Sequence, residues 1–177
     1  MNFREELVSI IRDIPDFPKP GILFRDITPL LENPEASKAV IPAIISQLDG
    51  LEIDAVAGIE SRGFLYGFPL AMALNVPFIA VRKKGKLPAE TVEFSYDLEY
   101  GSATIEMHKG SVRKGMKVLV HDDLLATGGT AVAAHELIKK EGGEVVAFSF
   151  LIELRSLAGR ELLVGQNRPI HSLVEYD

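Results

Sequence analysis

Residues 117–131 read KVLVHDDLLATGGTA, and this stretch decides the fold. An apolar strand ends in Asp122 and Asp123, and a loop of small residues then opens a helix near residue 129. Backbone N–H groups in such a loop, together with the N-terminus of the helix after it, favour an anion, so the loop predicts a phosphate site. The absence of a lysine after the glycines excludes the P-loop of nucleotide triphosphatases, and the dinucleotide fingerprint GxGxxG is missing. The predicted phosphate loop consists of Ala126, Thr127, Gly128, Gly129 and Thr130.

The two adjacent acids indicate what else the ligand carries. Beside a phosphate site, Asp122 and Asp123 would repel the phosphate unless they bound another group. Neighbouring carboxylates suit the two adjacent hydroxyls of a ribose, and they stabilise positive charge that develops on the sugar. The alternative is a helix-capping acidic turn with a glycine-rich bend. The order of strand, two acids, small loop and helix favours a ribose phosphate site.

Working outward from this stretch, apolar strands alternate with helices. This alternation predicts an α/β fold in which a parallel sheet is flanked by helices on both faces. Ligands of such sheets collect at the carboxyl ends of the strands. Residues 91–108 break the alternation and predict two extended arms joined through Gly101, a hairpin-like flap beside the sheet. The expected strands are 53–59, 77–82, 118–123 and 144–154, the last of which closes the series, and the expected helices between them are 62–75 and 129–142.

The amino-terminal part is predicted to be helical on either side of a proline-rich passage. Apolar residues on one face predict a helix over residues 2–13, which the prolines from Pro15 onward end. Asn33 is expected to cap a second helix with Pro34 at its first position. With no repeat and no long linker, residues 1–177 are expected to form a single domain.

Composition sets the protein class. Hydrophobic residues make up 47% of the 177 residues, charged residues make up 25%, and the net charge is −6, which argues against nucleic acid or an anionic membrane as a partner. The lack of cysteine favours a reducing compartment, and we expect a cytoplasmic protein without a signal peptide. Residues 63–81 carry no charge, but Pro69, Asn75 and Pro77 favour a buried helix followed by a strand over a membrane span.

HDDLLATGGTA closely resembles the phosphoribosyl diphosphate signature of the type I phosphoribosyltransferase superfamily. Four further segments, FPKPGILFRDITPLL, AGIESRGFLYG, VRKKGKLP and SYDLEYG, resemble its adenine-specific family in the right order and spacing. The resemblance covers nearly the whole chain. It implies a small N-terminal hood of about residues 1–33, which covers the base, and a flexible loop of about residues 83–102.

The resemblance assigns residues to the diphosphate. Ser61 and Arg62 would contact it from a turn that often holds a non-proline cis peptide, and Glu60 stands where the family usually has aspartate. Without the family match, a surface Glu–Arg turn at the start of a helix is an equal explanation. Arg82, Lys83 and Lys86 are further diphosphate candidates by resemblance. A solvated basic patch is the usual explanation for such a run of cations, but in an acidic protein and next to the end of a strand, binding of a polyphosphate is an equal explanation.

The resemblance also assigns the base and the proton transfer. Glu99 would be the general acid–base group, and Tyr100 would accompany it over the site. Adenine would stack against Phe24 and be recognised by backbone groups of Leu23 and Arg25.

The implied reaction transfers the 5-phosphoribosyl group from phosphoribosyl diphosphate to adenine and gives AMP and diphosphate. Asp122, Asp123, Arg62 and Glu99 would be the catalytic residues. Mg²⁺ is expected through the diphosphate rather than through protein ligands, and a homodimer is the habit of the family. Two alternatives stay open: an enzyme for another purine base, and a regulator that binds phosphoribosyl diphosphate without chemistry.

The four histidines share no metal-ligand spacing. HELIK has Lys139 where a zinc-binding HExxH would have its second histidine, so we reject a zinc site there. His121 replaces the valine or isoleucine usual before the two acids in the family. We expect it to be a strand residue that faces a neighbour and tunes one aspartate.

Overall fold

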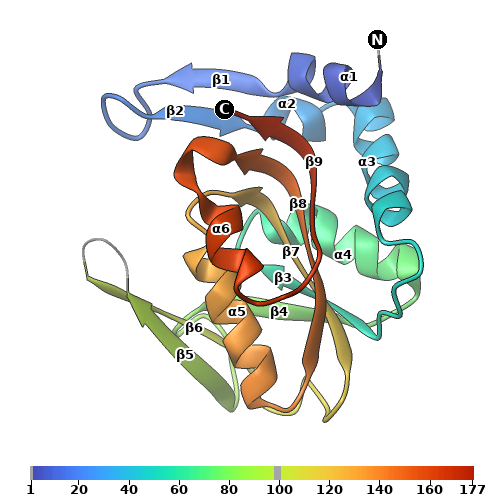
Figure 1. Cartoon of the computed structure of the whole chain (residues 1–177), viewed down its shortest axis with the longest axis vertical. Helices are drawn as coiled ribbons and strands as arrows, with labels where there is room; N and C mark the ends of the chain where they lie inside the picture. The colour runs from blue at the N-terminus through green and yellow to red at the C-terminus, as the bar shows by residue number, and fades with distance from the viewer. Residues whose placement is uncertain (1, 98–100) are drawn as a thin grey trace.

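One seven-stranded sheet runs through the computed structural model, which describes residues 2–97 and 101–177 (Figure 1). Its strand order is β5-β6-β4-β3-β7-β8-β9. β3, β4, β7, β8 and β9 pair in parallel, whereas β5, β6 and β4 pair antiparallel, so the parallel part was predicted correctly. The strands are β3 (Ala55–Ile59), β4 (Phe78–Lys83), β5 (Thr91–Asp97), β6 (Ser102–His108), β7 (Lys117–Leu125), β8 (Glu144–Leu154) and β9 (Ile170–Tyr176).

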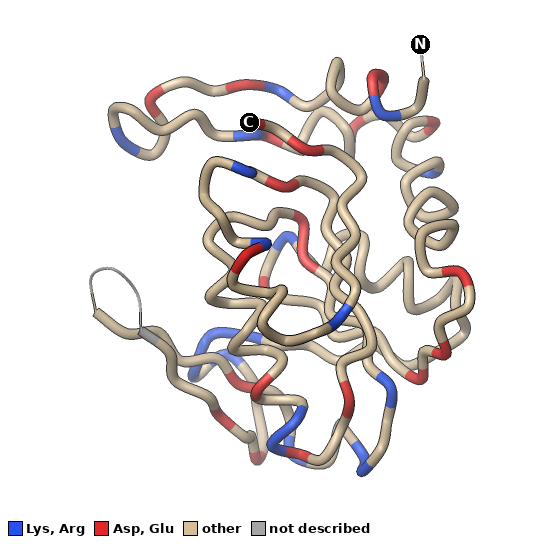
Figure 2. Tube along the Cα trace, in the orientation of Figure 1, with Lys and Arg blue, Asp and Glu red and all other residues tan. Residues whose placement is uncertain are grey.

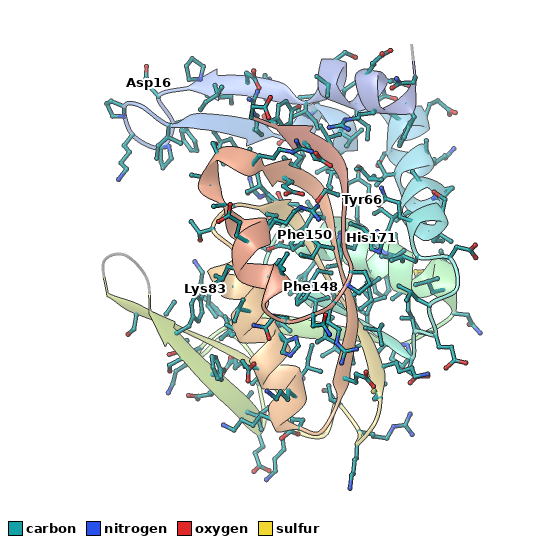
Figure 3. All side chains as sticks on the ribbon, viewed as in Figure 1. Asp16, Tyr66, Lys83, Phe148, Phe150 and His171 are labelled. Atoms are coloured by element: carbon teal, nitrogen blue, oxygen red, sulfur yellow. The ribbon has the colours of Figure 1, made fainter. Side chains whose placement is uncertain are left out.

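Helices cover both faces of the sheet, which explains why the central strands are apolar throughout. All five residues of β3 are buried. Phe148 and Phe150 of β8 pack in the cluster that includes α5 and α6, while Leu119 and Leu151 pack in the cluster on the opposite face with α3 and α4 (Figure 3). The helices are α3 (Pro34–Gln47), α4 (Gly63–Leu74), α5 (Gly129–Lys140) and α6 (Gly159–Val164), preceded by the short 3₁₀ helix η1 (Arg155–Leu157).

The amino-terminal elements form a small layer at the carboxyl end of the sheet (Figure 1). Asn33 caps α3 as predicted, and its side chain accepts a hydrogen bond from the Ala36 N–H. The helix predicted over 2–13 is too long: it ends at Ile10, because residues from Arg12 onward pair with β2 in an antiparallel ladder. The elements here are α1 (Phe3–Ile10), β1 (Arg12–Pro15), β2 (Leu23–Asp26) and α2 (Thr28–Leu31).

Two further predictions need correction. The two arms over 91–108 do form a hairpin, β5 and β6, but it extends the sheet instead of lying beside it, because Arg82 and Lys83 pair with Glu106 and Ile105. The strand over 144–154 does not close the series, since β9 pairs with it along the sheet edge. Only Val174 of β9 is buried, so its apolar pattern is too weak to mark a strand.

Residues 63–81 divide into α4 and β4, as their prolines predicted. In the described part of the chain, no helix combines the length and the apolar character needed to cross a membrane. Basic and acidic residues alternate along the outer loops and helices, so this view of the molecule has no side of one sign (Figure 2).

Candidate active site

The predicted phosphate loop lies between the end of β7 and the start of α5. Gly128 is the N-cap of α5 with φ 83°, a conformation that glycine adopts without strain. No side chain of the described residues caps this helix, so the first N–H groups of α5 are left for an anion. Together with Asp122, the loop lines a cavity of about 80 Å³. The Tyr96 hydroxyl of β5 lies 2.9 Å from Thr130 Oγ1, so the hairpin reaches the edge of the loop.

The two acids lie beside this loop, and Asp123 is only 4% exposed. Asp122 Oδ1 accepts a hydrogen bond from the Asp123 N–H at 2.8 Å. Arg62 Nε lies 2.8 Å from Asp123 Oδ2. Their geometry is that of an ion pair without an aligned hydrogen bond, and among the described residues this buried oxygen has no hydrogen-bond donor. A buried carboxylate oxygen in that state suits a ligand that supplies a hydroxyl.

Asp122 and Asp123 differ in how strongly their surroundings shift their pKa values. Burial raises the pKa of Asp122 well above its usual range, and the neighbouring charge of Asp123 adds to this effect. Burial also raises the pKa of Asp123, but the Arg62 guanidinium opposes that rise. We therefore assign the negative charge of the pair to Asp123 and the proton, when one is bound, to Asp122.

Arg62 connects the acids to the amino-terminal layer. It follows the Glu60–Ser61 peptide bond, which is cis as the resemblance implied, and it precedes the first residue of α4. Its guanidinium carbon lies 4.9 Å from the centroid of the Phe24 ring while its Nε faces Asp123. One side chain thus spans the gap between the predicted ribose and base positions.

The basic segment, residues 82–86, begins in the last two residues of β4 and is tied to two carboxylates. Arg82 Nε donates to Glu60 Oε2 at 2.8 Å, and the Lys83 N–H donates to the same oxygen at 3.2 Å. The buried Glu106 of β6 accepts hydrogen bonds from the N–H groups of Lys86 and Leu87, each at 2.9 Å. The side chains of Lys83 and Lys86 are exposed, so these cations are available to an anionic ligand.

Phe24 lines an apolar cavity of about 410 Å³ below the two-stranded sheet β1–β2. Phe17 packs edge-on against it, with ring centroids 5.2 Å apart. Leu65 of α4 and Arg62 line the same cavity. A flat aromatic ring fits such a space, with one face on Phe24. Leu23 and Arg25 flank Phe24 on β2, and Arg25 is held by an ion pair with Asp13 and by the Tyr176 ring 3.8 Å away.

Comparisons with known proteins agree with this geometry. Residues 27–162 match the model of the phosphoribosyl transferase domain. The chain is 56% identical to the adenine phosphoribosyltransferase of Agathobacter rectalis over 167 residues, which cover 94% of this chain and 95% of the relative. The chain belongs to the adenine phosphoribosyltransferase family.

Solved structures of this family have the same fold. The crystal structure from Thermoanaerobacter pseudethanolicus matches with a TM-score of 0.93 at 48% identity and covers 97% of this chain and 99% of its own. The structure from Saccharomyces cerevisiae, which was solved with adenine and an imino-altritol bisphosphate, matches with a TM-score of 0.91 at 40% identity, covering 97% and 98%.

The predicted site residues fall into three groups. Arg62, Asp123 and Phe24 are brought together, and the phosphate loop lies next to the acids. Ser61 precedes Arg62 in the turn after β3, while the basic segment begins at the end of β4, the strand that pairs with β3. Glu99 and Tyr100 lie outside the described residues. Their predicted roles stay predictions.

Sequence reasoning missed several residues that support the site. Tyr96 contacts Thr130. Glu106 fixes the backbone of the basic segment. Glu153, at the end of β8, is buried in an ion pair with Arg160. A charged residue inside or at the end of an apolar strand was the available signal for both glutamates, since such a group is buried only with a partner.

Proposed function

We propose that this chain serves purine salvage by transferring the 5-phosphoribosyl group from phosphoribosyl diphosphate to adenine, with AMP and diphosphate as products. One observation carries the proposal: Arg62 lies between Phe24 and the buried Asp123, and the adjacent Asp122 lines one cavity with the phosphate loop. A ribose phosphate and a flat base would each find a matching surface there. The adenine complex of the yeast relative supports adenine as the base.

The phosphate loop would hold the 5-phosphate and so fix the position of the sugar. Binding energy from this non-reacting group lowers the barrier when it orients the reacting carbon. Asp122 and Asp123 would accept hydrogen bonds from the ribose hydroxyls. Their negative charge stabilises the positive charge that builds on the sugar as the bond to diphosphate lengthens, while a ring nitrogen of adenine attacks the anomeric carbon.

Cationic side chains would bind the departing diphosphate. Arg62, Arg82, Lys83 and Lys86 are the candidates, with Ser61 and the backbone of its turn beside them. Arg82 is paired with Glu60, so it would share its charge between that carboxylate and the diphosphate. Lys83 and Lys86 are exposed, so their ammonium groups can bind the diphosphate without sharing their charge with a protein carboxylate.

Mg²⁺ fits the donors present. The diphosphate and several waters would hold Mg²⁺, with the carboxylate oxygens of Asp122 and Asp123 nearby. The Asp123 oxygen that has no hydrogen-bond donor among the described residues is left for a ribose hydroxyl. Mg²⁺ on the diphosphate would neutralise part of its negative charge.

The base would stack on Phe24 and be recognised by backbone groups of Leu23 and Arg25. Glu99 would act as general acid–base group with Tyr100 beside it, and residues 83–102 would close over the reacting sugar and exclude water. We include the hood of about residues 1–33 in a single domain with the rest of the chain.

The test is AMP formation from phosphoribosyl diphosphate, with and without Mg²⁺, in parallel reactions with adenine and hypoxanthine. The proposal predicts turnover with adenine that depends on Mg²⁺ and exceeds turnover with hypoxanthine. Preference for hypoxanthine would indicate an enzyme for another base. Binding of phosphoribosyl diphosphate without diphosphate release with any purine would indicate a regulator.

We also propose a homodimer that covers the outer face of α4. This face exposes Leu65 at 43%, Phe68 at 54% and Met72 at 66%, three large apolar side chains on one helix. A second copy of the chain would bury them. Sedimentation at assay concentration should give the dimer mass, and Met72→Glu should shift the mass toward the monomer. A fully active wild-type monomer would contradict this.

A further inference from the structure

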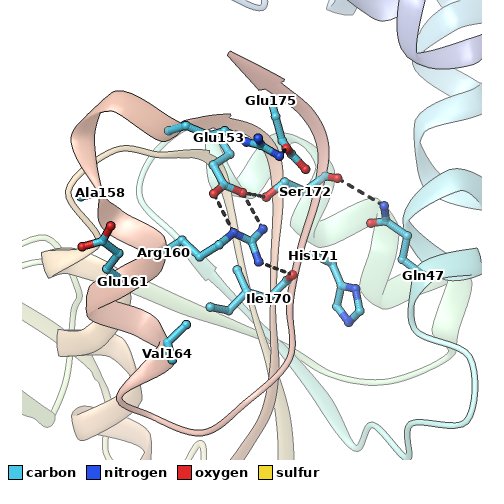
Figure 4. A pocket seen from close by; sticks show the side chains of 11 residues that line it. Gln47, Glu153, Ala158, Arg160, Glu161, Val164, Ile170, His171, Ser172 and Glu175 are labelled. Atoms are coloured by element: carbon cyan, nitrogen blue, oxygen red, sulfur yellow. Dashed lines mark hydrogen bonds and ion pairs between the residues drawn. The ribbon is translucent and has the colours of Figure 1, made fainter. Parts of the chain in front are cut away.

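Glu153 is a buried carboxylate that the proposed reaction does not use. It lies at the end of β8, is 2% exposed, and faces α6 (Figure 4). Arg160 donates to both of its oxygens, from Nε at 2.7 Å and from Nη2 at 2.6 Å, and the Ser172 hydroxyl donates at 2.7 Å. Arg160 Nη1 also donates to the Ile170 carbonyl at 3.1 Å. These bonds join the ends of β8, α6 and β9.

The ion pair between Glu153 and Arg160 lies at the start of α6, because Arg160 follows Gly159, the first residue of that helix. Gly159 is buried against the phosphate loop, and a Cβ on it would lie 2.1 Å from the Ala126 carbonyl oxygen and 2.9 Å from the Gly128 nitrogen. In return, a Cβ on Gly128 would lie 2.7 Å from the Gly159 carbonyl oxygen. The two backbones are therefore in direct contact, and neither has space for a side chain. The start of α6 therefore packs directly against the backbone of the phosphate loop.

We infer that Glu153 and Arg160 are positioning residues for the phosphate loop, and that they act through Gly159. The inference rests on the proposed role of this loop in binding the 5-phosphate. The ion pair would keep Gly159 against Ala126 and Gly128, so that the loop N–H groups hold the geometry that the phosphate requires. The main function of the ion pair is thus to support the affinity of the loop for the phosphate.

The chemistry of the pair agrees with a positioning role. Only the Glu153 side of this ion pair is buried, since its side chain is 2% exposed and that of Arg160 is 40% exposed. The cost of removing the carboxylate from water offsets much of its attraction to Arg160, so the pair adds little net stability. The planar guanidinium of Arg160 binds both carboxylate oxygens at once, and this geometry allows one relative orientation of α6 and β8. The Arg160 hydrogen bonds lower the pKa of Glu153, so the carboxylate stays ionised at neutral pH.

Two glycines, Gly159 at the start of α6 and Gly165 directly after its last residue, supply a matched test. Gly159→Ala places a methyl group against the loop backbone, whereas Gly165→Ala, at the other end of the same helix, brings its Cβ no closer than 3.4 Å to the nearest atom. Calorimetric titration with ribose 5-phosphate measures the affinity of the loop for a sugar phosphate and does not depend on turnover. We expect Gly159→Ala to weaken this binding at least tenfold and Gly165→Ala to leave it within twofold. Equal affinity of the two variants would overturn the inference.

Two variants, Arg160→Lys and Arg160→Met, test the ion pair. They also test the inference if Gly159→Ala fails to fold. The KM for phosphoribosyl diphosphate should rise about fivefold or more in Arg160→Met and less in Arg160→Lys, while the KM for adenine stays within twofold in both. A purely structural role would lower Tm and leave both KM values unchanged, and that result would overturn the inference. If wild-type protein binds ribose 5-phosphate yet makes no AMP, the proposed function fails while the binding comparison still decides this inference.

Discussion

The two halves of the site are built differently. The proposed ribose-phosphate half is built on the buried central strands: Asp123 lies near the end of β7, and the phosphate loop joins β7 to α5. The proposed base half belongs to a two-stranded sheet that exposes Phe17 in its loop and Leu23 at the start of β2. Arg62 connects the halves through Asp123 and the Phe24 ring. The chemistry that we propose thus lies on the sheet, while the proposed base recognition lies on a smaller, more exposed layer.

This difference makes separate predictions for the two halves. Substitutions in the ribose-phosphate half should lower the rate of chemistry, because that half stabilises charge on the reacting sugar. Substitutions in the base half should weaken adenine binding and leave the handling of phosphoribosyl diphosphate unchanged.

Asp123→Ala should have the largest effect. The variant loses the charged acceptor beside the sugar, and we expect kcat to fall by about 10²–10³-fold, the cost typical of removing one electrostatic group from an active site. Because burial raises the pKa of Asp123, its ionised form does not stabilise the fold, so Tm should stay within a few degrees of wild type. Steady-state kinetics and thermal melts measure both quantities. Near-normal kcat would contradict the assignment.

Phe24→Ala should have an intermediate effect confined to the base half. Stacking of a base on an aromatic side chain contributes about 1–3 kcal/mol, so the KM for adenine should rise about tenfold. The KM for phosphoribosyl diphosphate should stay within twofold. Phe24→Tyr is the matched control, since it keeps the ring. A rise in both KM values with Phe24→Ala would mean that the halves are not separable.

His121→Val should have the smallest effect at neutral pH and a clear one in acid. His121 is fully buried in β7, with its Nδ1 3.2 Å from Ser149 Oγ, and burial lowers its pKa from 6.5 to about 4. The folded state therefore favours the neutral ring. The stability that this histidine contributes is complete above pH 6.5 and is lost as the pH falls toward 4.

The measurement for this prediction is Tm at several pH values between 7.5 and 4.5. Wild type should lose more Tm across this range than His121→Val, because valine has no proton to take up. Comparing the change for each protein removes any constant offset from the altered packing. Parallel curves for the two proteins would show that His121 does not titrate in this window.

The order of strand, loop and helix around the two acids was predicted from the sequence, because its signals are local. Two acids, a small-residue loop and a helix follow one another within residues 122–130, and the strand before them is apolar on both faces. The limits of β8 and the cap of α3 were likewise predicted, since each depends on neighbouring residues. The Glu60–Ser61 cis bond followed from the family resemblance alone.

Features that depend on distant residues were not predicted. In β1, Arg12 forms an ion pair with Asp26 of β2, and Asp13 forms one with Arg25. This strand pairing outweighs the local helix propensity of the segment. β9 is an edge strand with one buried residue. It is recognised as a strand by its pairing with β8, which the sequence does not reveal. The ion pairs Arg62–Asp123 and Glu153–Arg160 join residues on separate elements, which sequence spacing does not reveal.

The central claim is that the loop of residues 126–130 binds the 5-phosphate while the acids beside it bind the ribose. A crystal structure of the AMP complex tests it most directly. We expect the phosphate within hydrogen-bonding distance of the loop N–H groups, the ribose hydroxyls on Asp122 and Asp123, and the adenine ring against Phe24. AMP bound elsewhere, with no phosphate in the loop, would contradict the account.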